Sequence, residues 1–280
     1  IIGESGSGKS TLVNMITRLI DADSGQILLK GRDITRLRGK ALRSVYSETQ
    51  MVFQQPADSF EPRRTLGDGI GESLRNNGWS AAAAREETAK LLDLCDLPAE
   101  FAGRYPHEVS GGQCQRAMIA MALAAKPDLL VADEPTTALD VTIQAQILEL
   151  LQDIKNKIDG SILLITHDLG VIAEMADYVV VMYAGKVIEK GTVMEIFQDP
   201  RHPYTIGLQK SKPTMDSDSD TLFNIPGNVP NPVNMPNHCY FKERCDRCIE
   251  KCGGDYPCMV QVSPTHYVSC HLYGEEEKHD

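Results

Sequence analysis

The sequence lacks the features of a membrane-spanning chain and shows little of those typical of a nucleic-acid-binding chain. No apolar run approaches the roughly 18 residues that a membrane-spanning helix needs, and the longest runs, such as Tyr178 to Ala184, have the length of a strand. Basic residues are also few, with 28 Lys and Arg against 39 Asp and Glu, and they form no dense run. Because a nucleic-acid binder usually carries a basic face, we expect no nucleic-acid partner.

The sequence shows no signal peptide, and it begins with Ile1 rather than Met. We therefore expect an N-terminal truncation, which leaves targeting open. The 280 residues, of which 42% are hydrophobic, suffice for one large domain or two smaller ones.

Helical and strand patterns alternate over the first 200 residues. Short apolar runs at Leu129–Ala132 and Ile162–Ile165, flanked by helical patterns, predict central parallel strands. Such alternation indicates an α/β protein with a doubly wound sheet. Further strands are expected at residues 26–29 and 50–53, and helices at residues 12–20, 81–95 and 113–125.

A glycine-rich loop opens the chain. Gly3-Glu4-Ser5-Gly6-Ser7-Gly8-Lys9-Ser10 fits G-x-x-x-x-G-K-[ST] in full, and a helical pattern follows, as the motif requires. In this motif backbone N–H groups surround phosphate oxygens, the lysine reaches the β- and γ-phosphates, and the hydroxyl of Ser10 binds Mg²⁺. The sequence therefore predicts ATP and Mg²⁺ as ligands. The expected nucleotide contacts are Gly3, Ser5, Gly6, Gly8, Lys9, Ser10 and Thr11.

Two acids end the apolar strand predicted at residues 129–132. Asp133 is placed to hold Mg²⁺, and Glu134 to polarise the water that attacks the γ-phosphate. Acids at the end of a strand can also simply cap a following helix. The catalytic interpretation of Asp133 and Glu134 therefore depends on the presence of the phosphate loop.

A second anion-binding helix start is predicted at Val109-Ser110-Gly111-Gly112-Gln113. It makes sense if it closes over nucleotide held by a partner chain. The alternative is an ordinary serine cap with a glycine turn.

These motifs resemble those of the ABC (ATP-binding cassette) transporter ATPases, and the resemblance covers nearly the whole chain. Val109 stands where the family signature usually has Leu, and Cys114 where Arg or Met is more familiar. The resemblance implies that Gln54 contacts Mg²⁺ and the attacking water, and that His167 senses the γ-phosphate. It also implies that Ala138-Leu139-Asp140 crosses to the partner subunit. The aromatic residue that stacks on adenine in the family would lie before Ile1.

The resemblance implies a P-loop NTPase cassette at residues 1–200, with a helical subdomain at about 60–125. The family forms head-to-tail dimers on membrane-spanning permease subunits at the cytoplasmic face of the membrane. Details such as Thr136 to Gln146 resemble the branch that imports oligopeptides, dipeptides or nickel, with an external binding protein and a paralogous second ATPase. Peptide uptake is thus the expected function. The alternatives are nickel uptake and a soluble ABC ATPase.

Residues 201–280 resemble the C-terminal extension of that branch, through the segments 201–205 and 225–230. Six of the eight cysteines lie here, after a stretch at residues 211–237 whose prolines indicate an extended linker. Four of them match the branch's spacing, which implies an iron–sulfur cluster in some members: Cys239, Cys245, Cys252 and Cys270. Four thiolates suit a [4Fe–4S] cluster or zinc, and free packed thiols remain the third alternative.

Overall fold

The computed structural model describes residues 1–137, 139–158, 160–211, 224–230 and 233–273. The chain forms two compact units. The first unit combines Ile1–Lys9 with Thr166–Asp280, and the second unit is Ser10–Ile165. Part of the linker predicted at residues 211–237 lies outside the described residues.

The second unit is built on a parallel sheet of three strands in the order β3-β4-β5. These strands are β3 (Thr49–Val52), β4 (Leu129–Asp133) and β5 (Ser161–Ile165). In the register, Ala132 pairs with Val52 on one side and with Leu164 on the other. Leu130, Val131 and Ala132 are fully buried. The short apolar runs therefore form parallel strands, as their composition predicts.

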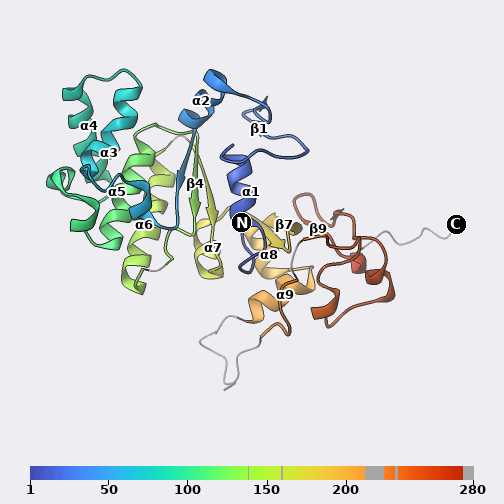
Figure 1. The fold of residues 1–280 in the computed structure, drawn as a ribbon. Helices are drawn as coiled ribbons and strands as arrows, with labels where there is room; N and C mark the ends of the chain where they lie inside the picture. Colours follow the sequence, from blue (N-terminus) through green and yellow to red (C-terminus); the bar gives the residue numbers. More distant parts are fainter. Residues whose placement is uncertain (138, 159, 212–223, 231–232, 274–280) are drawn as a thin grey trace. The chain divides into compact units, whose positions relative to one another are not determined.

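The described residues of this unit include the α-helices α1 (Lys9–Ile16), which begins one residue before the unit, α2 (Gly39–Glu48), α3 (Leu66–Asn76), α4 (Ala81–Leu94), α5 (Gly111–Leu123) and α6 (Val141–Lys157). In Figure 1, α3, α4 and α5 lie together, beyond one edge of the three strands. The hydroxyls of Thr65 and Ser80 cap α3 and α4 by accepting from Asp68 N and Ala83 N. Short 3₁₀ turns connect the helices at Pro56–Ser59, Ala99–Gly103 and Pro106–Glu108.

Two expected elements are shorter than their sequence pattern. The first helix ends at Ile16 instead of residue 20, because Arg18 adopts a left-handed backbone with φ of 62°. The buried guanidinium of Arg18 instead donates to the carbonyl of Ile34 at 2.9 Å. The strand expected at residues 26–29 is reduced to β1 (Leu28–Leu29), paired with β2 (Arg32–Asp33).

The first unit contains an antiparallel sheet in the order β6-β7-β9-β8. Its strands are β6 (Tyr178–Tyr183), β7 (Lys186–Thr192), β8 (Val260–Gln261) and β9 (Tyr267–Val268). The unit also holds α7 (Leu169–Met175), α8 (Val193–Gln198), α9 (Pro203–Lys210) and 3₁₀ turns at Lys242–Arg244, Glu250–Gly253 and His271–Tyr273. Because β8 and β9 come from residues 201–280, this C-terminal extension is built into the sheet of β6 and β7.

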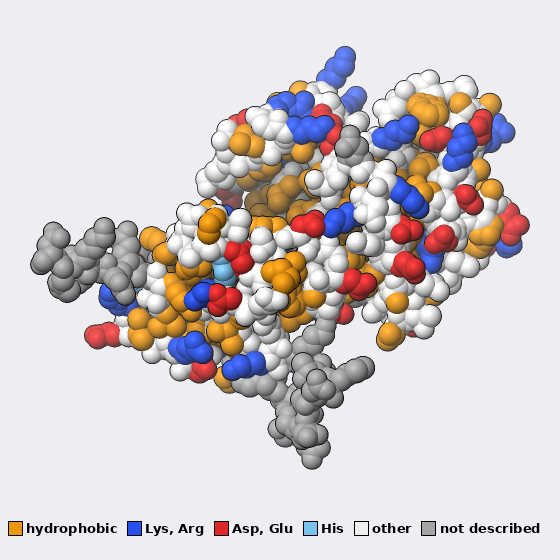
Figure 2. All heavy atoms as spheres, turned by 180° about the vertical axis from the view of Figure 1, so that it is seen from behind, with side chains coloured by type: hydrophobic (Ala, Val, Ile, Leu, Met, Phe, Trp, Pro, Cys, Tyr) orange, Lys and Arg blue, Asp and Glu red, His pale blue; other side chains and the backbone are white. Residues whose placement is uncertain are grey.

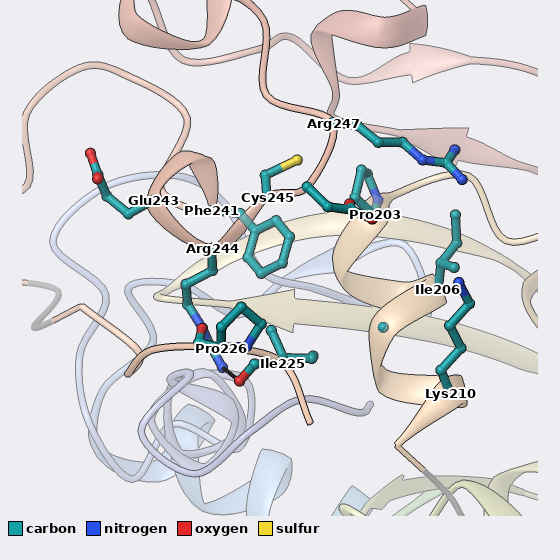
Figure 3. Close-up of a pocket in the computed structure, with 12 residues that line it drawn as sticks. Pro203, Ile206, Lys210, Ile225, Pro226, Phe241, Glu243, Arg244, Cys245 and Arg247 are labelled. Atoms are coloured by element: carbon teal, nitrogen blue, oxygen red, sulfur yellow. Dashed lines mark hydrogen bonds between the residues drawn. The ribbon is translucent and has the colours of Figure 1, made fainter. Parts of the chain in front are cut away.

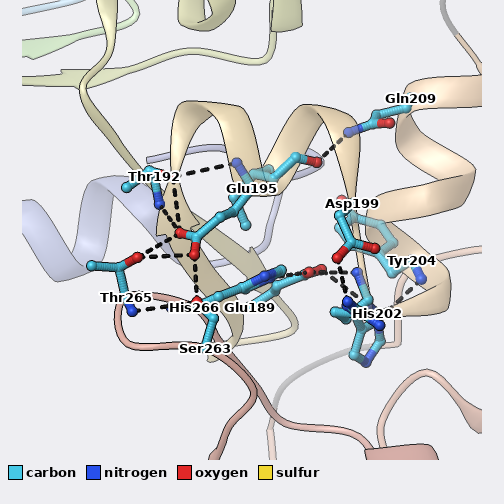
Figure 4. Close-up of polar contacts among 12 residues, drawn as sticks. Glu189, Thr192, Glu195, Asp199, His202, Tyr204, Gln209, Ser263, Thr265 and His266 are labelled. Atoms are coloured by element: carbon cyan, nitrogen blue, oxygen red, sulfur yellow. Dashed lines mark hydrogen bonds and ion pairs between the residues drawn. The ribbon is translucent and has the colours of Figure 1, made fainter.

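The fully buried carboxylate of Glu189 on β7 is one anchor of the C-terminal extension. Its oxygens lie 2.6 Å from the backbone N–H of Arg201, 3.0 Å from that of His202, and 2.8 Å from His266 Nε2 (Figure 4). Burial lowers the pKa of His202 to about 3, which keeps this ring neutral. A buried carboxylate is tolerated here because three donors satisfy it.

Glu195 on α8 is the second anchor. It closes a capping box with Thr192 and also accepts hydrogen bonds from the hydroxyls of Ser263 and Thr265 (Figure 4). The hydrogen bond from Ser263 contributes most to lowering the pKa of Glu195 to about 2, and the bonds from Thr192 and Thr265 add to it. The extension is thus held to β7 and α8 by polar contacts as well as by strand pairing.

The surface mixes both signs of charge. Figure 2 shows Lys and Arg interspersed with Asp and Glu over the face in view. None of the helices in the described residues combines the length and apolar character that a membrane crossing requires.

Replacing Glu189 tests its role as an anchor. Glu189→Ala leaves the N–H groups of Arg201 and His202 buried without an acceptor, so we expect a loss of about 3 kcal/mol in the free energy of unfolding. Urea unfolding of the intact protein measures it. Exposed Glu174 is the matched control, and Glu174→Ala should change stability by less than about 0.5 kcal/mol. Equal stability of the two variants would contradict the anchoring role.

Candidate functional site

The phosphate loop predicted from the sequence leads from Ile2 to the start of α1. Ile2 bonds to β6 through its backbone, accepting from Met182 N at 2.8 Å and donating to Val180 O at 2.9 Å. The buried ammonium of Lys9 donates to the carbonyls of Gly3 at 2.8 Å and Glu4 at 3.0 Å. The loop thus curls around its own lysine, and Ser5, Gly6, Ser10 and Thr11 are exposed.

The first glycine of the loop is required by a close approach. A Cβ atom on Gly3 would lie 2.3 Å from the carbonyl oxygen of Met182. A side chain there would push the loop off β6. Gly6 and Gly8 have φ of 78° and 91°, in the left-handed region that favours glycine.

The hydroxyl of Ser7 is buried and has no hydrogen-bond partner among the described residues. Its backbone is tied down, since Ser7 N donates to Glu4 O at 3.2 Å and Gly185 N donates to Ser7 O at 3.0 Å. An unpaired buried hydroxyl inside a phosphate-binding motif is consistent with a bound polar ligand.

The end of β4 brings together two of the residues predicted to act in hydrolysis. Glu134 Oε2 lies 3.4 Å from the side-chain nitrogen of Gln54 and 3.0 Å from the hydroxyl of Thr137. Glu134 has a left-handed backbone with φ of 47°, and its N–H donates to Ile165 O at 2.9 Å. Asp133, one residue before it, is buried. The Glu134 carboxylate and the Gln54 side chain therefore lie together, and only the family resemblance had indicated a catalytic part for Gln54.

Ser110 caps α5, as the structural alternative for this motif proposed. Its hydroxyl accepts from Gln113 N at 3.3 Å, and the Gln113 side chain accepts from Ser110 N at 2.9 Å. Gly111 and Ser110 are exposed. A Cβ on Gly112 would lie 2.5 Å from the Cγ2 of Ile143, so this glycine lets α5 approach α6. A capped helix start still presents backbone N–H groups, so the anion-binding function of this segment stays a prediction.

The remaining predicted residues lie at two other helix starts. Asp140 caps α6, its carboxylate accepting from Ile143 N at 3.0 Å. Ala138, in the same predicted loop, is outside the described residues. His167 is exposed and belongs to the first unit, directly before the Asp168 cap of α7.

The four cysteines of the implied metal set gather in the C-terminal extension. Cys239, Cys252 and Cys270 are buried and Cys245 is partly buried. Burial raises the pKa of Cys239 and of Cys245 to about 11, and nearby thiols add to the rise. Within the described residues, no three His, Cys, Asp or Glu side chains are arranged to hold a metal ion. The thiol groups are ligands that suit a soft metal, but the described residues of the extension do not form a ready-made metal site.

Sequence reasoning missed two residues of the extension that contact the phosphate loop. The hydroxyl of Tyr204 accepts from Glu4 N at 2.8 Å, and Arg244 forms an ion pair with the Glu4 carboxylate at 2.7 Å. Glu4 occupies a variable position of the motif, so the motif itself gave no signal. Tyr204 lies in the segment 201–205, which the sequence connects only with the C-terminal extension as a whole.

Family models match most of the chain. A model described as "ABC transporter" matches residues 1–137, and one described as "Oligopeptide/dipeptide transporter, C-terminal region" matches residues 188–252. A model described as an AAA domain also matches residues 102–173.

Curated relatives are similar over nearly the full chain. A dipeptide transport ATP-binding protein of Bacillus subtilis is 46% identical, covering 100% of this chain and 86% of the relative. An oligopeptide transport ATP-binding protein of the same organism is 48% identical over 97% of this chain and 79% of its own length. A dipeptide transport ATP-binding protein of Lactococcus lactis is 44% identical over 97% of this chain and 80% of its own length.

Solved structures show the same fold. The protein cbiO1 of Clostridium perfringens, part of the ABC transporter complex cbiONQ, has a TM-score of 0.64 and 26% identity, over 74% of this chain and 82% of that chain. The ATP-binding cassette MJ0796, in a dimeric post-hydrolysis state with ADP and Pi, has a TM-score of 0.63 and 28% identity over 69% and 83%. The relatives, the matching models and the geometry of the phosphate loop agree: the chain belongs to the ABC transporter family, as an ATPase cassette with an oligopeptide/dipeptide-transporter C-terminal region.

Proposed function

We propose that this chain is the ATP-hydrolysing subunit of an importer that drives uptake of dipeptides or oligopeptides. The observation that carries the chemistry is the contact between Glu134 and Gln54 at the end of β4, in a chain whose phosphate loop is complete. The names of the relatives support the peptide substrate, since they describe dipeptide and oligopeptide transport ATP-binding proteins.

ATP binding is assigned to the phosphate loop and the start of α1. Gly3, Gly6 and Gly8 let the loop backbone curve, and Lys9 supplies positive charge to the β- and γ-phosphates. Ser10, Gln54 and Asp133 each offer a side-chain oxygen, which is the ligand type that Mg²⁺ prefers. When bound, Mg²⁺ neutralises charge that develops on the phosphoryl group.

Hydrolysis is assigned to Glu134, supported by Gln54 and His167. The Glu134 carboxylate is half-buried and held by Thr137 and Gln54, an arrangement that suits a group that orients water and accepts its proton. His167 is the residue expected to contact the γ-phosphate.

The cassette is proposed to span residues 1–200, with the helical subdomain at about 60–125 and the C-terminal extension at residues 201–280. We place Ser110, Gly111, Gly112, Gln113 and Asp140 on nucleotide held by a second, paralogous ATPase subunit. The dimeric state of MJ0796 supports such a pairing. The pair would dock on two permease subunits at the cytoplasmic face of the membrane, fed by an external binding protein.

We also propose a metal group for Cys239, Cys245, Cys252 and Cys270, with a [4Fe–4S] cluster as its form. Their common thiol chemistry and their place in one segment support it, since three of the four are buried and Cys245 is partly buried. A metal would cross-link residues 239–252 to residue 270 and stabilise the extension.

The test of the function is uptake of labelled dipeptides, longer peptides and Ni²⁺ in cells that lack the gene. We expect the wild-type gene to restore peptide uptake. Lys9→Ala should abolish it together with ATP binding, because the variant removes the charge that the phosphates require. Peptide uptake by the Lys9→Ala variant would disprove the site, and restoration of Ni²⁺ uptake alone would disprove the substrate.

The role of Glu134 predicts a separation of binding from hydrolysis. Glu134→Gln keeps the shape of the side chain but removes its basicity, so ATP binding should persist while hydrolysis slows by roughly 10²–10⁴-fold. Phosphate release under saturating ATP measures the rate. Thr137→Val, which removes only a hydrogen bond to the carboxylate, is the milder comparison. Hydrolysis by Glu134→Gln at the wild-type rate would assign the base elsewhere.

The metal proposal is tested by anaerobic purification with iron and sulfide analysis. We expect a brown protein with the broad visible absorption of an iron–sulfur cluster. Cys245→Ser should bleach it and destabilise the extension, whereas exposed Cys258→Ser should not. Stoichiometric zinc in a colourless protein would select zinc, and a metal-free protein would leave the cysteines as packing residues.

A further inference from the structure

The carboxylate of Glu4, inside the phosphate loop, forms an ion pair with an arginine of the C-terminal extension. Arg244 Nη1 lies 2.7 Å from Glu4 Oε2, and Nη2 lies 3.1 Å from Oε1. The two residues are 240 positions apart in sequence and belong to the same compact unit. This paired geometry is the strongest form of side-chain ion pair in proteins.

Arg244 is itself fixed on every side. Nε donates to Pro226 O at 2.8 Å, and Nη1 lies 3.3 Å from the hydroxyl of Tyr183. The guanidinium also lies 5.7 Å from the centre of the Tyr183 ring and 6.0 Å from that of Phe241 (Figure 3 shows Phe241 and Pro226 around it). The Arg244 side chain is 5% exposed. Such packing leaves the arginine a single orientation, aimed at the loop.

The backbone of Glu4 is held by the extension as well. Its N–H donates to the hydroxyl of Tyr204 at 2.8 Å. Tyr204 is fully buried, and its ring centre lies 4.8 Å from that of Tyr183 and 5.5 Å from that of Phe241. The aromatic cluster of Tyr183, Tyr204 and Phe241 thus joins β6, α9 and residues 238–245 beneath the start of the loop.

An acid in a phosphate loop needs compensation. A free carboxylate there would repel the polyphosphate of a nucleotide, and the repulsion is strong where water is partly excluded. Arg244 cancels that charge while it holds the carboxylate in place. Loss of the arginine would therefore have two effects, a looser loop and an unpaired negative charge.

We propose that Arg244 is a positioning residue for ATP binding, which acts through Glu4 to fix and neutralise the start of the phosphate loop. The C-terminal extension would then be a working part of the nucleotide site in the same chain. This inference rests on the proposed binding of ATP by the phosphate loop. Nothing in it requires the metal group.

The experiment measures the dissociation constant for Mg²⁺-ATP of the intact protein, by competition with a fluorescent ATP analogue. Arg244→Met should raise this constant about tenfold, as expected if only about a tenth of the loops remain competent. Adding Glu4→Gln should restore the affinity to within about threefold of wild type, because the unpaired charge is removed. Exposed Arg247→Met is the matched control and should bind ATP as wild type does.

The rescue separates an effect of Arg244 that acts through the charge of Glu4 from a merely structural role. If Arg244→Met only destabilised the fold, the second substitution would not restore ATP affinity, and that result would overturn the proposal. Unchanged affinity in Arg244→Met would also overturn it. The proposed function would still stand in either case, provided that Lys9→Ala abolishes binding. ATP binding that survives Lys9→Ala would instead reject the nucleotide site itself.

Arg244→Lys guards against a variant that does not fold. It keeps the charge but loses the paired geometry, so its affinity should fall between those of wild type and Arg244→Met. Glu4→Gln alone, with Arg244 intact, should weaken ATP binding less than Arg244→Met does. Equal or greater weakening by Glu4→Gln would show that the carboxylate matters for itself and would contradict the proposal.

Discussion

Two backbone hydrogen bonds between Ile2 and β6 are the constraint on which the nucleotide loop depends. They set the loop so close to the strand that a Cβ on Gly3 would strike the carbonyl of Met182. Once Gly3 is fixed, the chain must reverse within a few residues, and the carbonyls of Gly3 and Glu4 converge on the ammonium of Lys9. The ammonium group of Lys9 is therefore held by backbone carbonyls of the loop itself.

The pattern of neighbouring residues is sufficient to predict those parts of the fold that short segments determine by themselves. The apolar runs at β4 and β5 are short and buried, and nothing but a covered parallel sheet accommodates them. The phosphate loop and the acids at the end of β4 could be predicted from the sequence. A glycine-rich loop with a lysine, followed later by carboxylates at the end of a strand, has few other functions. The contact of Gln54 with Glu134 required more, since only the resemblance to a family placed Gln54 near the acid.

Contacts between distant segments left no trace in the local pattern. The residues around Glu4 do not indicate its ion pair with Arg244. An acidic residue at a variable position of the motif is ordinarily expected to face solvent. Glu189 reads as an ordinary polar residue in β7, yet three donors from residues 201–266 converge on it. The early end of α1 has the same origin: Arg18 leaves the helix because the carbonyl of Ile34 offers its guanidinium a buried partner. Tertiary contacts overrode the helical pattern there.

The pairing of β9 with β7 has a consequence for the solubility of the chain. Val268 and Tyr267 occupy the side of β7 at Glu189 and Lys190, and Ser269 N donates to Ile188 O at 2.7 Å. Without them β7 would end the sheet with unpaired backbone groups, which are a template for strand addition from another chain. A cassette shortened before β9 would thus expose an unpaired strand edge on β7, so the extension that supplies Tyr204 and Arg244 also protects the protein from self-association through β9.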